Sequence, residues 1–247
     1  MKLVTKHIGI LIITVTFFMS CEETVEVPVE PAVSFKSFSV VEFEEEPEFF
    51  QLQFDLTDGD GDIGLLPEQD FVPFHEFDLI LDADNQLVRK SNEVSPPFFR
   101  LRPNGERFFF SEEDERPAFD LFNYMLMDTI ASGVELSDTV MIHRNLFHNN
   151  IYVSVLRKEG ENYLPAGGRD SRPLISGRFS MSGGTAKVAP IISAVSFPIA
   201  ADQFKHLSLQ DTLKLEFYIF DRNLNQSNIE VTPEFRLSDL LSDEAGD

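Results

Sequence analysis

Apolar and polar residues alternate with a period of two along several segments of this chain. In residues 50–57 and again in 213–219, every second residue is apolar, which is typical of a strand with one face on a core and the other in water. Residues 151–155 begin a similar run, which ends at a turn over 158–162. These runs predict strands of antiparallel sheets.

Three other segments predict strands with local irregularities. The apolar parity of residues 33–41 changes midway, which predicts a β-bulge. Asn104-Gly105 lies between two apolar runs and predicts a tight hairpin. Apolar residues of one parity over 229–237 predict a last strand, and Pro233 within it indicates an edge of the sheet.

Helical spacing occurs only between about residues 111 and 130. The apolar residues there recur three or four apart, and Pro117 suits the first turn of a helix: Ala118, Leu121, Phe122, Met125. Many short strands and one helical segment favour an all-β fold. We expect an immunoglobulin-like β-sandwich with an elaborated middle insertion and one short helix that covers part of the core.

The organisation along the chain follows from these elements and from local composition. We expect a signal peptide over residues 1–20, a tether over 21–32, a single sandwich domain over 33–241 and an acidic tail over 242–247. Residues 65–145, approximately, are expected to be the insertion between framework strands. A division into two domains stays open as an alternative, although no flexible linker separates the halves.

The first residues combine a short basic lead, an uncharged apolar stretch over 8–18 and a small residue before Cys21. This is typical of an export signal and too short for a membrane span. The segment resembles bacterial lipoprotein signals, in which the thiol carries the lipid. We therefore expect lipidation at Cys21 and an outer-membrane anchor, with a buried structural cysteine as the alternative. The acids at 22–23 either direct the protein to the cell surface or solvate the tether.

Composition limits the partners and the sources of stability. The chain has a net charge of −22, or −24 once Lys2 and Lys6 are removed with the signal, so its surface repels phosphate backbones and we expect no nucleic-acid binding. Cys21 is the only cysteine, so no internal disulfide can form and stability must come from the core. Phe supplies 25 residues and Trp none, which predicts a core of packed phenyl rings.

Two loops carry oxygen-bearing side chains at alternate positions. One follows the strand at 50–57, and the other is the turn between the last two predicted strands. In immunoglobulin-like sandwiches, loops at these positions gather at one end. Because calcium binds six to eight oxygens, the two loops predict one shared calcium site, although the first lacks the Gly and Glu of an EF-hand. The candidate ligands are Asp58, Asp60, Asp62, Asp221, Asn223 and Asn225.

Both loops have a second interpretation that needs no metal. Asp and Asn in turns accept hydrogen bonds from their own backbone, and Gly supplies positive φ. Arg222 can bridge to the Asp58–Asp62 loop as a structural link. The acidic segment 82–85 predicts a plain hairpin turn, and we assign it no ligand.

The two loops also carry a resemblance. Phe54-x-Leu-x-Asp-Gly-Asp-Gly-Asp-Ile-Gly64 and Phe220-Asp-Arg-x-x-Asn-x-Ser-Asn228 resemble segments of uncharacterised bacterial surface lipoproteins with an immunoglobulin-like fold. The second motif is also similar to the last hairpin of fibronectin type III modules. With the lipid signal, the resemblance covers about a fifth of the chain. It implies a binding or spacer module and no activity.

The sequence contains none of the common catalytic motifs. It has no G-x-S-x-G and no H-E-x-x-H, and His143 and His148 are five apart with no evident third ligand. We therefore expect a non-enzyme, a lipid-anchored envelope module that binds a protein or glycan or has a structural role. One alternative is an envelope or polysaccharide hydrolase with paired carboxylates. Another is an accessory subunit of an outer-membrane complex, marked by a large exposed apolar patch.

Overall fold

A computed structural model gives the fold of most of the chain. Cys21, the expected signal peptide and most of the expected tail lie outside the residues that it describes. The described residues are 27–43, 46–116, 122–131, 134–166, 175–180 and 190–242.

The first sheet of the sandwich has three antiparallel strands in the order β1-β2-β11. These strands are β1 (Ala32–Phe43), β2 (Glu46–Asp58) and β11 (Ile191–Ala200). In β2 the side chains of 50, 52, 54 and 56 are buried while those between them are not, as the period of two predicts. The predicted bulge in β1 is confirmed, because the register with β2 shifts between Phe35 and Ser37.

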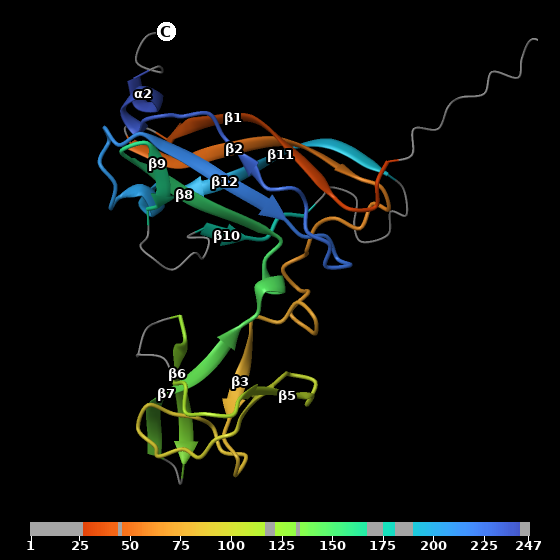
Figure 1. Cartoon of the computed structure of the whole chain (residues 1–247), viewed down its shortest axis with the longest axis vertical. Helices are drawn as coiled ribbons and strands as arrows, with labels where there is room; N and C mark the ends of the chain where they lie inside the picture. The colour runs from red at the N-terminus through yellow and green to blue at the C-terminus, as the bar shows by residue number, and fades with distance from the viewer. Residues whose placement is uncertain are drawn as a thin grey trace, which may run out of the picture.

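The second sheet packs over the first and has the order β10-β8-β12-β13, with β9 also paired to β8 (Figure 1). Phenyl rings from both sheets meet in the core, where the ring centroids of Phe54 and Phe217 are 5.3 Å apart. The strands are β8 (Ile151–Glu159), β9 (Asn162–Pro165), β10 (Ile175–Gly177), β12 (Leu213–Ile219) and β13 (Glu230–Val231).

The division of strands between the two sheets matches the immunoglobulin type. There, strands A, B, E and D form one sheet, and strands C, F and G form the other. Here β1, β2 and β11 take the positions of A, B and E, and β8, β12 and β13 take those of C, F and G. The predicted all-β sandwich is confirmed. This strand order places the loop after β2 and the loop after β12 at the same end.

A third sheet is built from the chain between β2 and β8, and we call it the second lobe (Figure 1). Its strand order is β5-β4-β3-β7-β6, and it has a small core of its own: Ile80, Val88, Phe98, Tyr124 and Met141. The Asn104-Gly105 hairpin is confirmed here, with Gly105 at φ 85°. The strands are β3 (Phe77–Leu81), β4 (Phe98–Leu101), β5 (Arg107–Ser111), β6 (Tyr124–Ala131) and β7 (Val134–Arg144).

The helix expected within residues 111–130 is wrong where the structure describes that range. Ala118 and Leu121 lie outside the described residues, Phe122 is exposed, and Met125 belongs to strand β6. β6 pairs residue for residue with β7 over eight positions, and this ladder prevails over the helical spacing of the side chains. The α-helix among the described residues is α2 (Leu237–Ser242), with short 3-10 turns at η1 (Leu146–His148) and η2 (Ala201–Phe204).

The expected last strand is shorter than its apolar pattern indicated. Ile229 and Val231 are exposed, and Thr232 between the expected core positions is buried instead. The Thr232 hydroxyl accepts a hydrogen bond from the amide of Leu215 at 2.9 Å, while Pro233 has no amide hydrogen for the ladder. The strand therefore ends after two residues. No helix in the described part of the chain is long and apolar enough to cross a membrane.

Candidate cation site at the sandwich rim

The two oxygen-rich loops meet at one end of the sandwich, as the sequence predicted, and we call this end the rim. Ile63 pairs with Asp221 in a short antiparallel bridge. The carbonyl oxygen of Asp62 accepts two hydrogen bonds from Arg222, one from its amide at 3.2 Å and one from Nε at 2.7 Å. These contacts join loops that are about 160 residues apart along the chain.

Asp58 is the last residue of β2, and its carboxylate has no hydrogen-bond partner. The residue is 0% exposed, and neither Oδ1 nor Oδ2 is bonded. Burial, together with the charges of Asp60 and Asp221, raises the pKa of Asp58 to about 6. The amides of Asp62 and Ile63 lower this pKa in part but lie outside hydrogen-bonding geometry. A buried carboxylate without a partner is costly, since it has lost water and gained nothing in exchange.

Asp62 and Asp221 turn their carboxylates toward the same point. Oδ1 of Asp62 is also buried without a partner. Burial, followed by the charges of neighbouring carboxylates, Asp221 first, raises the pKa of Asp62 to about 7. Burial raises the pKa of Asp221 as well, although hydrogen bonds from Asn225 oppose the rise. One oxygen from each of Asp58, Asp62 and Asp221 lies within 4.8 Å of the others.

The other three predicted ligands surround this cluster and are bonded to protein groups. The amide nitrogen of Asn223 donates to Oδ2 of Asp60 at 3.2 Å, which adds a bond between the two loops on the exposed side. Asn225 donates to both oxygens of Asp221, from its backbone amide and from its side chain, each at 2.7 Å. Asn225 therefore positions Asp221, in the manner of an Asx turn.

The geometry of these three carboxylates, two of them on buried residues, suits one cation. Oxygens bound to a calcium ion at about 2.4 Å can be at most about 4.8 Å apart, so a single ion can reach all three. Carboxylates are hard ligands, and a set made only of oxygens favours calcium or magnesium over softer metals. Of the six residues predicted from sequence, the structure brings all six to one place and turns three toward a common point.

Residues 27–28 and Val33, which precede or begin β1, also contact the rim. The sequence pattern did not indicate these contacts. The side chain of Asn228 accepts from the amide of Val33 at 2.8 Å and donates to its carbonyl at 2.9 Å. The backbone of residues 27–28 passes so close to Gly59 that an added Cβ would lie 2.3 Å from the carbonyl oxygen of Val27. Such contacts depend on the fold and leave no local signal.

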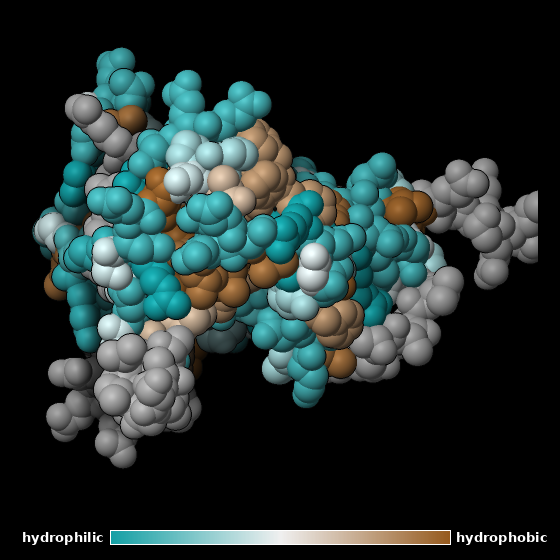
Figure 2. Space-filling model, turned by 90° about the horizontal axis from the view of Figure 1, so that it is seen from below, coloured by the Kyte–Doolittle hydropathy of each residue, from teal (hydrophilic) through white to brown (hydrophobic). Residues whose placement is uncertain are grey.

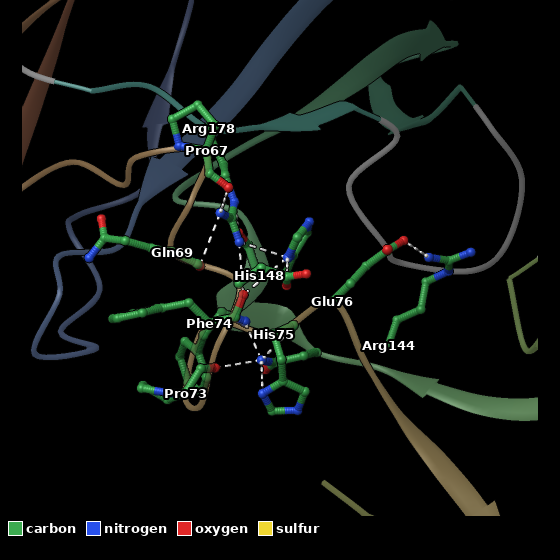
Figure 3. A network of polar contacts seen from close by, with 12 residues as sticks. Pro67, Gln69, Pro73, Phe74, His75, Glu76, Arg144, His148 and Arg178 are labelled. Atoms are coloured by element: carbon green, nitrogen blue, oxygen red, sulfur yellow. Dashed lines mark hydrogen bonds and ion pairs between the residues drawn. The ribbon is translucent and has the colours of Figure 1, made fainter. Parts of the chain in front are cut away.

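A second polar network joins the sandwich to the second lobe (Figure 3). Its centre is Arg178, whose guanidinium donates to main-chain carbonyls of residues 66, 69 and 74 at 2.8–3.1 Å. Arg178 also donates to Nδ1 of His148 at 2.7 Å, which makes that nitrogen the acceptor. Asn145 lies nearby and donates to the carbonyl of His75 at 2.7 Å. We call this the junction network, and its bonded groups indicate a structural role.

His143 and His148 belong to different surroundings. His148 is part of the junction network, whereas His143 lies on β7 beside Asp78 and Arg100, with its Nδ1 3.9 Å from Asp78 Oδ2. His75 forms a buried pair with Asp78 at 2.7 Å. Exposed apolar residues are spread over both the sandwich and the second lobe, and Figure 2 shows apolar side chains in a few patches between hydrophilic ones.

Comparisons with known proteins give no relative from which a function could be carried over. No family model, curated protein sequence or solved structure matches the chain significantly. The rim geometry is therefore the basis on which a function is proposed.

Proposed function

We propose that this chain is a lipid-anchored cell-envelope protein whose β-sandwich binds a calcium ion at the rim and acts as a binding or structural module. The observation that carries the proposal is the carboxylate of Asp58, which is buried and has no partner. It converges with Asp62, whose Oδ1 also has no partner, and with Asp221, whose oxygens accept hydrogen bonds from Asn225.

The electrostatics favour a cation over a purely structural turn. In an ordinary Asx turn the carboxylate accepts backbone hydrogen bonds, as Asp82 does from the amides of residues 84 and 86. Asp58 and Asp62 Oδ1 lack such bonds, and the raised pKa values of Asp58 and Asp62 express the cost of keeping them charged. A divalent ion supplies the missing partner and displaces the protons that would otherwise neutralise the acids.

The role as a module is supported by the architecture and by the N-terminal signal. The rim is formed by loops equivalent to B–C and F–G, which antibody variable domains use for recognition. An ion that joins these loops would hold them rigid for a protein or glycan partner, because a preorganised surface loses less entropy on binding. The expected lipid at Cys21 would place this surface at the outer membrane.

The cation is tested by melting the purified full chain in detergent, with millimolar calcium or with chelator. A ligand that binds only the folded state stabilises it by about 2.7 kcal/mol at 100 times its dissociation constant. For a domain of this size the melting temperature would rise by about 5–10 °C. A melting temperature that does not change, together with no heat of binding in calorimetry, would overturn the proposal.

A further inference from the structure

We infer that the cation at the rim controls the docking of residues 27–31, the segment that connects the sandwich to the expected lipid anchor. This inference rests on the proposed cation site and adds a consequence of its occupancy. We call residues 27–31 the docked segment.

The first observation is the close contact between the docked segment and the loop that bears Asp58. A Cβ added to Gly59 would lie 2.3 Å from the carbonyl oxygen of Val27 and 2.4 Å from that of Pro28. Both obstacles are backbone atoms, which cannot swing away as a long side chain can. Val27 is half-buried and Pro31 is buried, so the segment lies against the domain at both of its ends.

The second observation concerns the other loop, which holds the start of β1. Asn228 bonds both the amide and the carbonyl of Val33, at 2.8 and 2.9 Å. Oε1 of Glu230 accepts from the amide of Phe35 at 3.1 Å. The residues that precede and begin β1 therefore contact both rim loops, one at Gly59 and the other at Asn228.

The cation determines whether these two loops keep the positions in which they contact the docked segment and the start of β1. Asp58 and Asp62 lie on one loop and Asp221 on the other, so one ion bridges them. Without the ion, and at a pH at which all three acids are ionised, the carboxylates repel one another across the same gap, and this repulsion favours separation of the loops. The docked segment has no strand partner of its own over 27–31. We therefore expect it to dissociate from the domain when the two rim loops separate.

The consequence is a change in the reach of the tether. With Val27 docked, the six residues after Cys21 can span at most about 20 Å. With the segment released as far as β1, the eleven residues after Cys21 can span up to about 40 Å. Calcium would therefore hold the sandwich close to the membrane, and its removal would nearly double the distance that the domain can reach.

The test places a nitroxide spin label in the docked segment of the full chain. Cys21→Ser removes the only cysteine, and Val29→Cys then offers a single thiol at a position that is 50% exposed. In calcium we expect a spectrum dominated by immobile label. In chelator we expect the mobile component to become the larger part. A label at Leu209→Cys, which is 52% exposed and precedes β12 at the far end of that strand, should not respond.

Gly59→Ala supplies the matched variant. Its added methyl group excludes the docked segment without removing any carboxylate, so we expect a mobile label at 29 in calcium as well as in chelator. The rise in melting temperature with calcium should persist. The comparison of calcium with chelator in the Val29→Cys chain needs no further substitution, so the inference stays testable if Gly59→Ala does not fold.

The outcomes separate this inference from the proposed function. If calcium raises the melting temperature but the label at 29 is equally immobile with and without it, the cation site stands and control of docking is overturned. If calcium changes neither property, the proposed cation site fails and the inference fails with it.

Discussion

Replacement of Asp58 by Asn distinguishes a cation ligand from a turn residue. The amide has nearly the same shape as the carboxylate but carries no charge. Without calcium, Asp58→Asn removes a buried acid from the three that converge, and we expect the free energy of unfolding at pH 8 to increase. With calcium, the same change removes a ligand, and we expect most of the calcium-induced stabilisation to be lost.

The size of the effect follows from the pKa of Asp58. A rise from 3.8 to about 6 corresponds to about 3 kcal/mol at 1.36 kcal/mol per unit. Solvent near the rim screens part of this, and the buried amide still lacks good hydrogen bonds, so about 1–2 kcal/mol remains. In chelator the melting temperature of the variant should exceed that of the wild type by about 2–8 °C.

The pH dependence gives a second measurement on the same two proteins. The pKa of Asp58 is higher in the folded state, so between pH 3.8 and about 6 the folded chain binds more protons than the unfolded chain. Calcium-free wild type therefore loses stability as the pH rises through this window. The variant lacks this contribution, so the two curves should converge below about pH 3.8, separate between pH 3.8 and about 6, and stay a constant distance apart above about pH 6.

Asp82→Asn is the matched control. Asp82 is also buried, but its Oδ1 accepts hydrogen bonds from the amides of Asp84 at 3.0 Å and Gln86 at 2.8 Å. We expect this variant to be less stable than the wild type by a similar amount in calcium and in chelator. If Asp58→Asn behaves in the same way, in denaturant titrations under both conditions, then Asp58 is a turn residue and the reasoning is refuted.

Three further predictions concern the anchor, the junction and the core. Cys21→Ser should move the protein out of the membrane fraction and abolish incorporation of labelled fatty acid, and continued membrane association would disprove the lipid anchor. Arg178→Ala should cost about 3–5 kcal/mol in denaturant titration, because several partly buried carbonyls lose a charged donor; an effect under 1 kcal/mol would contradict this. Phe217→Ala should cost about 3–5 kcal/mol in the same assay because Phe217 is 0% exposed, whereas Ile192→Ala at 75% exposure should change little. Equal effects at the two positions would refute the packing argument.

Local patterns in the sequence were sufficient for much of the sandwich. Alternation predicted β2, β8 and β12, and the change of parity predicted the bulge in β1. The turns at Asn104-Gly105 and at 158–162 were also predicted, with Gly105 and Gly160 at positive φ. These features depend on neighbours within a few residues, so the side chains themselves carry the information.

Tertiary pairing decided the elements that the pattern mispredicted. Met125 has the spacing of a helix, yet it lies in β6 because β7 offers a complete ladder beside it. Val231 has the parity of a core residue but is exposed, and Thr232 takes the buried position where its hydroxyl bonds Leu215. In both cases hydrogen bonds to a strand from elsewhere in the chain satisfied more polar groups than the locally preferred conformation could.

The candidate site was likewise predicted in part from the sequence and decided in part by the tertiary structure. The sequence was enough to name both loops, and the immunoglobulin-like strand order was enough to bring them to one end. Only the tertiary structure separated Asp58, Asp62 and Asp221, which converge, from Asn223 and Asn225, which bond protein groups. It also placed residues 27–28 against Gly59. Spacing along a chain determines which side chains can share a face, whereas burial and the lack of a partner depend on what the rest of the chain packs around them.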